Sequence, residues 1–374
     1  MAIAFLRKAR AGDVRGTALL RLDFNAEDDW RMRAALPTVR FLLDASCRIV
    51  IVSHRGRPAG VRIADGAPRG FDKKLSLRKD AARLRKLLRR KVAFVDHFRF
   101  PEIKKRVAAA PAGSIFLLEN LRFLPGEEAD DPALARALAS LADFYVNDAF
   151  AVSHRANASV TAVAKLLPSY AGLELEKEIR CLSRVMRAPR RPLAVVIGGA
   201  KAADKLGVIK YFERRADEFL LGGGSANTVL AMRGMDVKRS ARDTDPKDLA
   251  LLRRAAYSRK VLLPSDFAWS GGRILDIGPE TARAFAEKIA AARTIFWSGP
   301  LGFIEKKRFT KGSLAVARAV ARNRRAFSVT GGGETVMFLK KYRLDAKFSF
   351  VSTGGGAMLD FLAGKKLPGI EVLR

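Results

Sequence analysis

The sequence predicts an α/β protein with two doubly wound, Rossmann-like parallel sheets, and three observations lead to that prediction. Ten short apolar or β-branched runs are each followed at once by a cluster of Gly, Arg, His or Asp residues. Amphipathic stretches with helical spacing separate these runs, as in repeated βαβ units. The length of 374 residues exceeds that of one ordinary domain and suits two.

The ten clusters are of two kinds. The first four are rich in Arg and His, whereas the later ones are rich in Gly with scattered Lys, Glu and Asp. In chain order they are DFN (23–25), HRGRP (54–58), ENLRF (119–123), DAFAVSHRANAS (148–159), GGAKAADK (198–205), GGGSAN (222–227), SDF (265–267), SGPLGFIE (298–305), TGGGET (330–335) and TGGGA (353–357). One Gly pair alone indicates a turn. Ten such clusters, each directly after an apolar run, indicate ligand-binding loops at the carboxyl ends of strands.

Two stretches show how the strands are connected. In DPALARALASLADF, Asp131 is placed to cap a helix and Pro132 to occupy its first position. The stretch LPSYAGLELEKEIRCLSRVMRAP separates the two kinds of cluster, and its Ile179, Leu182 and Met186 follow helical spacing. We interpret it as a helix that joins two domains, with the boundary near residues 165–180.

Composition favours a globular protein of the cytoplasm. No apolar run reaches about 18 residues, the N-terminal segment is soon interrupted by charge, and Cys47 and Cys181 have no metal-like spacing.

The net charge of +32 suggests a nucleic-acid-binding protein as an alternative. No zinc spacing, RRM-like aromatic signature or basic region with heptads accompanies it. Solvated helix faces are therefore the simpler explanation of the charge, with weak, nonspecific polyanion binding as its consequence.

The first four clusters suit a small, doubly anionic ligand. Arg31, Arg57, Arg122 and Arg155 come from four regions at strand ends, and a guanidinium binds carboxylate or phosphate through paired hydrogen bonds. His54 lies in one of these clusters, and Asp23 and Asn25 have the polar atoms to bind a hydroxyl. Taken singly, each arginine is better explained by a surface salt bridge, and His54 is equally well explained by a structural role.

The later clusters suit a nucleotide. Glycines let backbone N–H groups approach phosphates, and helix N-termini favour anions. Lys201 and Lys205 stand four residues apart, so we expect them on one face of a helix that starts there. Glu334 is placed to hold Mg²⁺, and Glu305 to bind ribose hydroxyls. The chain has no P-loop, dinucleotide or protein-kinase signature.

In this order the clusters resemble phosphoglycerate kinase of the bacterial and eukaryotic type, over nearly the whole chain from about Leu20. The segments on which this resemblance rests are RLDFN, DDWRMRAALPT, SHRGRP, ENLRF, VNDAFAVSHRANAS, AGLELEKE, GGAKAADK, GGGSANT, DIGPET, SGPLGFIE, TGGGET and STGGGA. The resemblance implies reversible, Mg²⁺-dependent phosphoryl transfer between 1,3-bisphosphoglycerate with ADP and 3-phosphoglycerate with ATP. It also implies a monomer.

The resemblance also implies which domain and which ligand each site residue belongs to. The first domain, 1–165 with the tail from about 360 to 374, binds 3-phosphoglycerate; a helix and hinge region follow at 166–180; and the second domain, 181–359, binds the nucleotide across a cleft. The substrate residues are Asp23, Phe24, Asn25, Arg31, His54, Arg55, Gly56, Arg57, Arg122 and Arg155. The nucleotide residues are Gly199, Lys201, Lys205, Gly223, Glu305, Gly331, Gly332, Gly333, Glu334, Thr335, Gly354 and Gly355.

Arg31 and Lys205 are the expected catalytic residues, acting after the domains close. The chain departs from the family pattern in four places: Glu334 replaces the usual Asp, Ser298 replaces a common Asn, Arg55 replaces a usual Leu, and the loop after Asn25 is shortened. Because the basic residues and both lysines are retained, we expect an active enzyme rather than an inactive relative kept as a scaffold.

Overall fold

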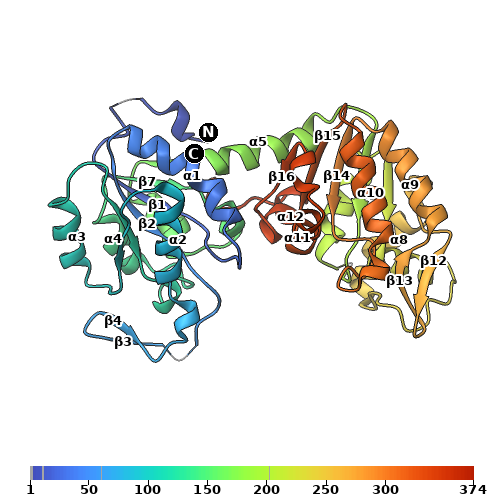
Figure 1. Cartoon of the computed structure of the whole chain (residues 1–374), viewed down its shortest axis with the longest axis horizontal. Coiled ribbons are helices and arrows are strands. Elements are labelled where there is room, and N and C mark those ends of the chain that lie inside the picture. Colours follow the sequence, from blue (N-terminus) through green and yellow to red (C-terminus); the bar gives the residue numbers. More distant parts are fainter. Residues whose placement is uncertain (1–2, 11, 60, 202) are drawn as a thin grey trace. The chain divides into compact units, whose positions relative to one another are not determined.

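A computed structural model describes residues 3–10, 12–59, 61–201 and 203–374. Its contacts divide the chain into two compact units (Figure 1). Unit 1 comprises Met1–Glu178 with Lys366–Arg374, and unit 2 comprises Ile179–Lys365. Each unit contains one sheet of six parallel strands, which confirms the predicted fold class.

The sheet of unit 1 has the strand order β5-β6-β2-β1-β7-β8. Its strands are β1 (Thr17–Arg21), β2 (Arg48–Val52), β5 (Ala93–Val95), β6 (Ile115–Leu118), β7 (Phe144–Asn147) and β8 (Ser169–Ala171). Every residue of β1, β6 and β7 is buried, as expected of central strands that helices cover on both faces. Because all the strands are parallel, the loops that follow them emerge at one edge of the sheet.

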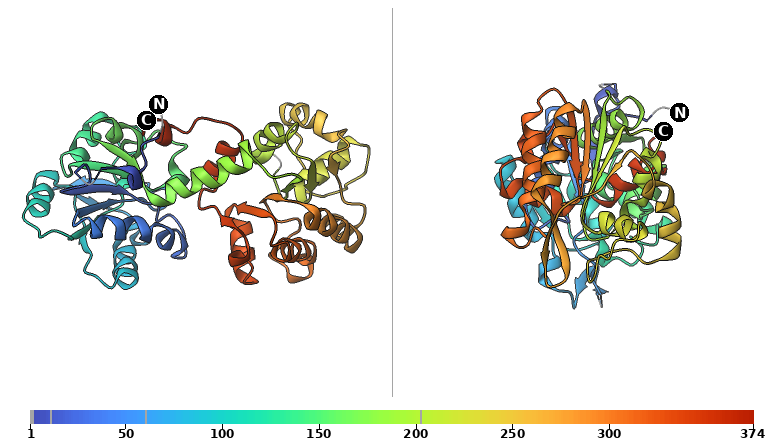
Figure 2. Two further views of the ribbon diagram at one scale, coloured as in Figure 1. Left: turned by 90° about the horizontal axis from the view of Figure 1, so that it is seen from above. Right: turned by 90° about the vertical axis from the view of Figure 1, so that its right-hand side faces the viewer.

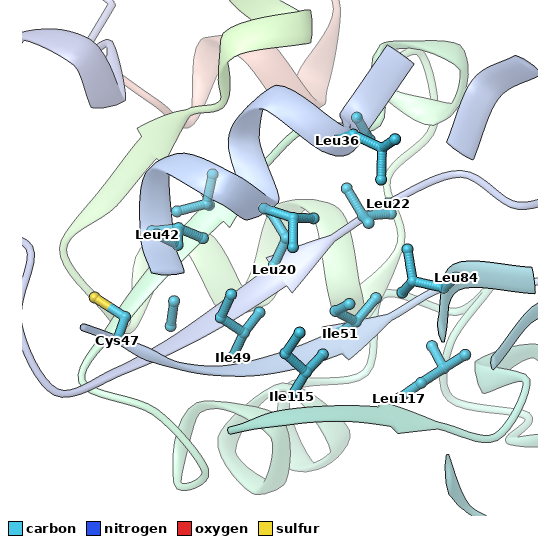
Figure 3. Packing of buried hydrophobic residues seen from close by; sticks show 14 of the residues in the cluster. Leu20, Leu22, Leu36, Leu42, Cys47, Ile49, Ile51, Leu84, Ile115 and Leu117 are labelled. Atoms are coloured by element: carbon cyan, nitrogen blue, oxygen red, sulfur yellow. The ribbon is translucent and has the colours of Figure 1, made fainter. Parts of the chain in front are cut away.

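Helices pack their apolar faces on this sheet. They are α1 (Trp30–Asp44), α2 (Arg78–Leu88), α3 (Phe100–Ala108), α4 (Pro132–Ala139) and the start of α5 (Leu173–Arg187), with a hairpin of β3 (Arg62–Ala64) and β4 (Ala67–Arg69) after β2. Leu36 and Leu42 of α1 and Leu84 of α2 meet Ile49 and Ile51 of the sheet (Figure 3). The α4 helix starts as predicted, because the Asp131 side chain accepts a hydrogen bond from Ala133 N and Pro132 is the first helical residue.

The sheet of unit 2 has the strand order β11-β10-β9-β14-β15-β16. Its strands are β9 (Leu193–Ile197), β10 (Glu218–Leu221), β11 (Val261–Leu262), β14 (Thr294–Ser298), β15 (Phe327–Gly331) and β16 (Phe350–Val351). From β9 the chain builds outward to β11 and then returns to the other side of β9 at β14. The gap between the loops after β9 and β14 is therefore where a doubly wound sheet binds its ligand.

The remaining elements of unit 2 surround this sheet. They are α6 (Leu206–Phe212), α7 (Gly223–Met232), α8 (Pro246–Ala256), α9 (Pro279–Ala291), α10 (Lys311–Arg322), α11 (Gly333–Lys341), α12 (Gly356–Leu362) and a hairpin of β12 (Phe267–Ser270) and β13 (Arg273–Ile277). Trp297 of β14 is fully buried among side chains of α9 and α10. The α7, α11 and α12 helices each begin at a glycine, shortly after a strand.

All ten predicted strands are present, but the predicted joining helix is wrong at its start. Residues Ser169–Ala171 form β8, because Gly172 N continues the pairing with β7 by donating to Asn147 O (2.8 Å). The α5 helix begins only at Leu173, where Asp148 Oδ1 accepts from the N–H groups of Glu174 and Leu175. The strand β5 and both hairpins were not predicted, since each is short and its burial is irregular.

The two ends of the chain lie together in unit 1 (Figures 1 and 2). Ala4 N donates to Leu373 O (2.8 Å), and α13 (Pro368–Glu371) packs beside the loop after β7. There Asn147 Nδ2 donates to Gly369 O (2.9 Å) and Gly369 N donates to Ser153 O (2.9 Å). Within the described part of the chain, no helix has the length and apolar character needed to cross a membrane.

Candidate active site

Polar and charged side chains converge at the carboxyl edge of the sheet in unit 1. Asp23 follows β1, His54 follows β2, Arg122 follows β6 and Arg155 follows β7. The charges of Asp23, Arg122 and Arg155 all act on His54, so the four loops meet around this side chain. The structure therefore brings together residues that the sequence placed in four separate clusters.

Arg31 and Asp23 form the best-defined pair of this cluster. Arg31 Nη1 donates to Asp23 Oδ2 (2.7 Å) and to Asn25 O (3.0 Å). Burial acts to raise the pKa of Asp23, but the positive side chains around it and the Asn25 N–H hold that pKa below its usual value. Arg31 Nε is buried and has no hydrogen-bond acceptor among the described residues. This donor fits an anion bound from outside.

His54 is held as a neutral ring with one defined tautomer. Arg21 Nη2 lies 3.2 Å from His54 Nδ1, and a guanidinium can only donate, so Nδ1 accepts and the proton sits on Nε2. Burial lowers the pKa of His54 well below its usual value, and Arg21, Arg122 and Arg155 lower it further, against the opposing effect of Asp23. His54 is thus a hydrogen-bond donor through Nε2, not a cation.

The remaining predicted side chains of unit 1 differ in how firmly they are held. Arg122 Nη1 donates to Gly56 O (2.6 Å), and its buried Nε lies 3.3 Å from Glu128 without hydrogen-bond geometry. Arg155 is half-buried, and its Nε donates to His154 Nε2 (3.2 Å). Arg57 is exposed, with no ion pair or hydrogen bond of its side chain among the described residues.

Phe24 and Arg55 were predicted to bind substrate, but the structure gives both side chains other partners. Phe24 is 3% exposed and packs in the hydrophobic core. Arg55 forms an ion pair with Asp80 and donates to the carbonyl groups of Phe24 and Ala26. Both side chains are therefore engaged in contacts within the protein.

Arg21 is a member of the cluster that sequence reasoning missed. It is 1% exposed at the end of β1, where its guanidinium donates to Leu22 O, Ser159 Oγ and His54 Nδ1. Glu127 balances this charge at 3.9 Å and also accepts from Ser159. The signal was present in the sequence, because a charged residue inside the apolar run ALLRL has no place in a core unless it is paired.

In unit 2 the corresponding edge of the sheet is built from backbone rather than side chains. Gly199 N donates to Pro300 O (2.6 Å), and Gly224 N donates to Gly199 O (2.8 Å). A methyl group at Gly198 would lie 2.2 Å from Pro300 O, and one at Gly224 would lie 2.0 Å from Ala200 O. These positions require glycine because three loops approach each other closely.

A pocket of about 800 Å³ lies where α6, α11 and α12 begin. Its lining includes Gly332, Gly333, Thr335 and Gly355 of the predicted set, together with Lys201, Lys205 and Glu334. Thr335 Oγ1 accepts from Gly299 N (2.9 Å), which ties α11 to the loop after β14. Gly331 and Gly354 are buried just behind this lining, at the ends of β15 and β16. The N-termini of α11 and α12 make this edge suited to phosphate groups.

The two predicted lysines are not on one face of a helix, which corrects the sequence-based expectation. Lys201 precedes the one-turn 3-10 helix Ala203–Lys205, and α6 starts only at Leu206. The Lys205 side chain instead folds back, so that Nζ donates to Lys201 O (3.3 Å). Burial lowers the pKa of Lys205, whereas Asp204 and Glu334 act to raise it. Lys201 is exposed, so only Lys205 is held in a defined place.

A second, narrower pocket of about 160 Å³ adjoins the first. Apolar side chains such as Ile274, Leu301 and Phe303 line it, with Gly199, Gly223 and Glu305 of the predicted set. Ala200 and Glu334 line both pockets. Together the two spaces form a continuous site with an apolar end and a phosphate-binding end, the composition that a nucleotide requires.

Comparisons with known proteins agree with this geometry. A sequence model described as phosphoglycerate kinase matches residues 13–365. This chain belongs to the phosphoglycerate kinase family. A phosphoglycerate kinase of Moorella thermoacetica is 42% identical over 384 residues, covering 95% of each chain, and one of Thermus thermophilus is 42% identical over 389 residues, covering 95% and 96%.

Solved structures of the phosphoglycerate kinase family have the same fold as this chain. The structure of phosphoglycerate kinase from Coxiella burnetii superimposes with a TM-score of 0.84 at 32% identity, covering 100% of this chain and 99% of that one. The one from Pyrococcus horikoshii has a TM-score of 0.81 at 30% identity, covering 96% and 95%. Family membership confirms the predicted type of enzyme, a kinase.

The carboxylates of this phosphoglycerate kinase family member fit a metal ion that arrives with a nucleotide. Among the described residues, no group of three or more His, Cys, Asp or Glu side chains is arranged to hold a metal. Mg²⁺ is usually held by one or two carboxylates together with substrate phosphates. Glu334 supplies one such carboxylate in the first turn of α11, exposed beside Lys205.

Proposed function

We propose that this protein transfers a phosphoryl group reversibly between 1,3-bisphosphoglycerate with ADP and 3-phosphoglycerate with ATP, with Mg²⁺. One observation carries the proposal: two sites of complementary chemistry are built at the carboxyl edges of two separate sheets. The first consists of buried guanidinium groups and a neutral imidazole. The second consists of glycine backbone and helix N-termini beside a buried lysine.

The site in unit 1 suits 3-phosphoglycerate because the ligand carries a phosphate, a carboxylate and a hydroxyl. Arg122, Arg155 and the exposed Arg57 provide cations for the two anionic groups. His54 Nε2–H provides a neutral donor, and Asp23 with Asn25 provides groups that bind the hydroxyl. The buried Nε of Arg31 is a further donor, at the end of the ligand from which the phosphoryl group is exchanged.

The site in unit 2 suits ATP and ADP. The narrow apolar pocket accepts the nucleobase, with Glu305 beside it to accept hydrogen bonds from the ribose. The phosphates then extend toward Lys201, Lys205 and the glycines that begin α11 and α12. Glu334 and the phosphates would hold Mg²⁺, which would supply positive charge to offset the charge of the transferred group.

Catalysis in this proposal depends on electrostatic stabilisation rather than covalent chemistry. Phosphoryl transfer requires in-line positioning of the two ligands and stabilisation of charge on the equatorial oxygens. We assign that stabilisation to Arg31 and Lys205. Because these residues belong to different units, transfer requires that the two bound ligands approach each other and that water is excluded.

A coupled assay with 3-phosphoglycerate, ATP and Mg²⁺ tests the proposal. We expect turnover that depends on all three components and stops when Mg²⁺ is chelated. Titration calorimetry of each ligand separately is the companion measurement. Folded protein that binds neither ligand and shows no turnover would contradict the assignment.

The net charge of +32 supports a second, weaker interaction with polyanions. We expect nonspecific binding to heparin or DNA that falls steeply as salt concentration rises. Binding that resists salt or prefers one sequence would instead favour a dedicated nucleic-acid function.

Three further properties stay predictions from the sequence: the cytoplasmic location, the monomeric state and the domain boundaries at 165, 180 and 359.

A further inference from the structure

The segment after β1 is held by its backbone carbonyl groups. Arg55 donates to Phe24 O (Nη2, 2.7 Å) and to Ala26 O (Nη1, 3.0 Å), and Arg31 donates to Asn25 O (3.0 Å). Two guanidinium groups therefore bind three consecutive carbonyls. This segment carries Asp23 and Asn25 and leads into α1, which carries Arg31. Its position determines where these side chains lie.

The other side of the Arg55 guanidinium is bound by α2. Arg55 Nη2 donates to Asp80 Oδ1 (2.7 Å) and Nε donates to Asp80 Oδ2 (3.1 Å), a paired contact with a carboxylate that is 2% exposed. Burial raises the pKa of Asp80, whereas the hydrogen bonds and charge of Arg55 act to lower it. Removal of either partner leaves a poorly solvated charge.

Arg55 is also fixed where it leaves the sheet. Its N–H donates to Asn120 Oδ1 (3.2 Å), and its carbonyl accepts from Asn120 Nδ2 (2.8 Å). Next to it, Gly56 N donates to Asn25 Oδ1 (2.9 Å). The side chain thus connects the anchored end of β2 and the first turn of α2 to the backbone of residues 24–26.

We propose that Arg55 and Asp80 form a positioning pair for the substrate site and that Arg55 does not bind substrate. The Arg55 guanidinium makes four hydrogen bonds within the protein, so no paired donors remain for a phosphate or carboxylate. The pair stabilises the shortened loop after Asn25 in the conformation that presents Asp23, Asn25 and Arg31. This inference rests on the proposed 3-phosphoglycerate site.

Asp80→Asn distinguishes positioning by Arg55 from direct binding. If Arg55 positions the loop, loss of the Asp80 charge loosens it, and the Kd of 3-phosphoglycerate rises about tenfold. If Arg55 binds substrate, a guanidinium released from Asp80 leaves that Kd unchanged or lowers it. The measurement is calorimetric titration of 3-phosphoglycerate, with KM for 3-phosphoglycerate and for ATP measured separately.

A double substitution keeps the positioning role falsifiable if Asp80→Asn folds poorly. Arg55→Leu combined with Asp80→Val replaces both charges with apolar groups of suitable size, so no buried charge is left unpaired. We expect the Kd of 3-phosphoglycerate in the double variant to match that of Arg55→Leu alone, because both lack the same contact. The Kd of ATP should not change in either variant, because ATP binds the other unit.

Arg78→Leu is the matched control, because Arg78 lies on the same helix as Asp80 and its ion pair with Asp96 is well exposed. It should leave the Kd of both ligands unchanged. Wild-type affinity for 3-phosphoglycerate in folded Asp80→Asn, or in the folded double variant, overturns the positioning role. Wild-type protein that fails to bind 3-phosphoglycerate overturns the proposed function itself, which is a separate outcome.

Discussion

The two candidate sites lie at equivalent edges of similar sheets but use different parts of the chain. In unit 1 the site consists of buried side chains that bind one another, such as Arg31 with Asp23 and Arg21 with His54. In unit 2 it consists mainly of backbone brought together at glycines, with Lys205 as a buried cation beside it. The first site is therefore sensitive to lost charge, and the second to added volume.

The largest effect is expected at Arg31 and Lys205, the one residue from each site that we assign to the transferred phosphoryl group. Lys205→Ala and Arg31→Ala should each lower kcat by about a thousandfold while the protein remains folded. Lys210→Ala on α6 and Arg33→Ala on α1 are controls that remove exposed cations nearby. Steady-state kinetics with circular dichroism measures both effects. Near-normal turnover in either active-site variant would remove that residue from the mechanism.

The next largest effect is expected when a side chain is added at a glycine of unit 2. Gly198→Ala should lower the free energy of unfolding by about 2–3 kcal/mol, because its methyl group meets backbone at Pro300. Gly333→Ala places its methyl group in open space at the start of α11, so its stability should be retained. If phosphates contact this backbone, its affinity for ATP should nevertheless fall. Urea unfolding and ATP titration separate the two effects, and equal stability of both variants would contradict the comparison.

A smaller effect is expected at the one carboxylate shared by both pockets of unit 2. Glu334→Ala should raise the Mg²⁺ concentration for half-maximal turnover by about tenfold. Glu334→Asp should retain turnover, because it keeps the carboxylate and shortens its reach by one methylene group. Asp360→Ala is the control, since Asp360 lines the same pocket but pairs with Lys365. An unchanged Mg²⁺ requirement in Glu334→Ala would assign the metal to other groups.

The smallest effect concerns the buried imidazole of unit 1. His54 has a folded-state pKa well below 6.5, so below pH 6.5 the unfolded chain binds a proton there that the folded protein does not. The contribution of neutral His54 to the free energy of unfolding is therefore present above pH 6.5 and is lost as the pH falls below it. Between pH 7.5 and 5.5, wild-type protein should lose about 1 kcal/mol more than His54→Gln, measured by urea unfolding. Equal losses would mean that His54 titrates normally in the folded state.

The sequence predicted the strands and their loops well because these features are local. Apolar runs such as LAVVI end at glycine, and this pattern marks β9 and the loop after it without reference to the rest of the fold. The resemblance of consecutive motifs to one family then predicted the reaction. Strand β8 was assigned to a helix because it has only three residues and is partly exposed, so no apolar run marks it in the sequence.

The partners of individual side chains were not predictable in the same way. Arg55 and Arg57 stand two residues apart in HRGRP, yet one is paired with Asp80 and the other is exposed. Their difference depends on the place of α2 relative to β2, which is a tertiary property. Lys205 likewise folds back toward the Lys201 carbonyl instead of extending from a helix.

The hydrogen bond between Ala4 and Leu373 has a consequence for synthesis on the ribosome. Unit 1 combines the segment up to Glu178 with the later segment Lys366–Arg374, whereas unit 2 is one continuous segment between them. The N-terminal unit therefore cannot complete its core until residues 366–374 have been synthesised, because Leu373 and Ile370 are buried in it. Unit 2 emerges without that dependence, so the half that is translated later is able to finish folding first.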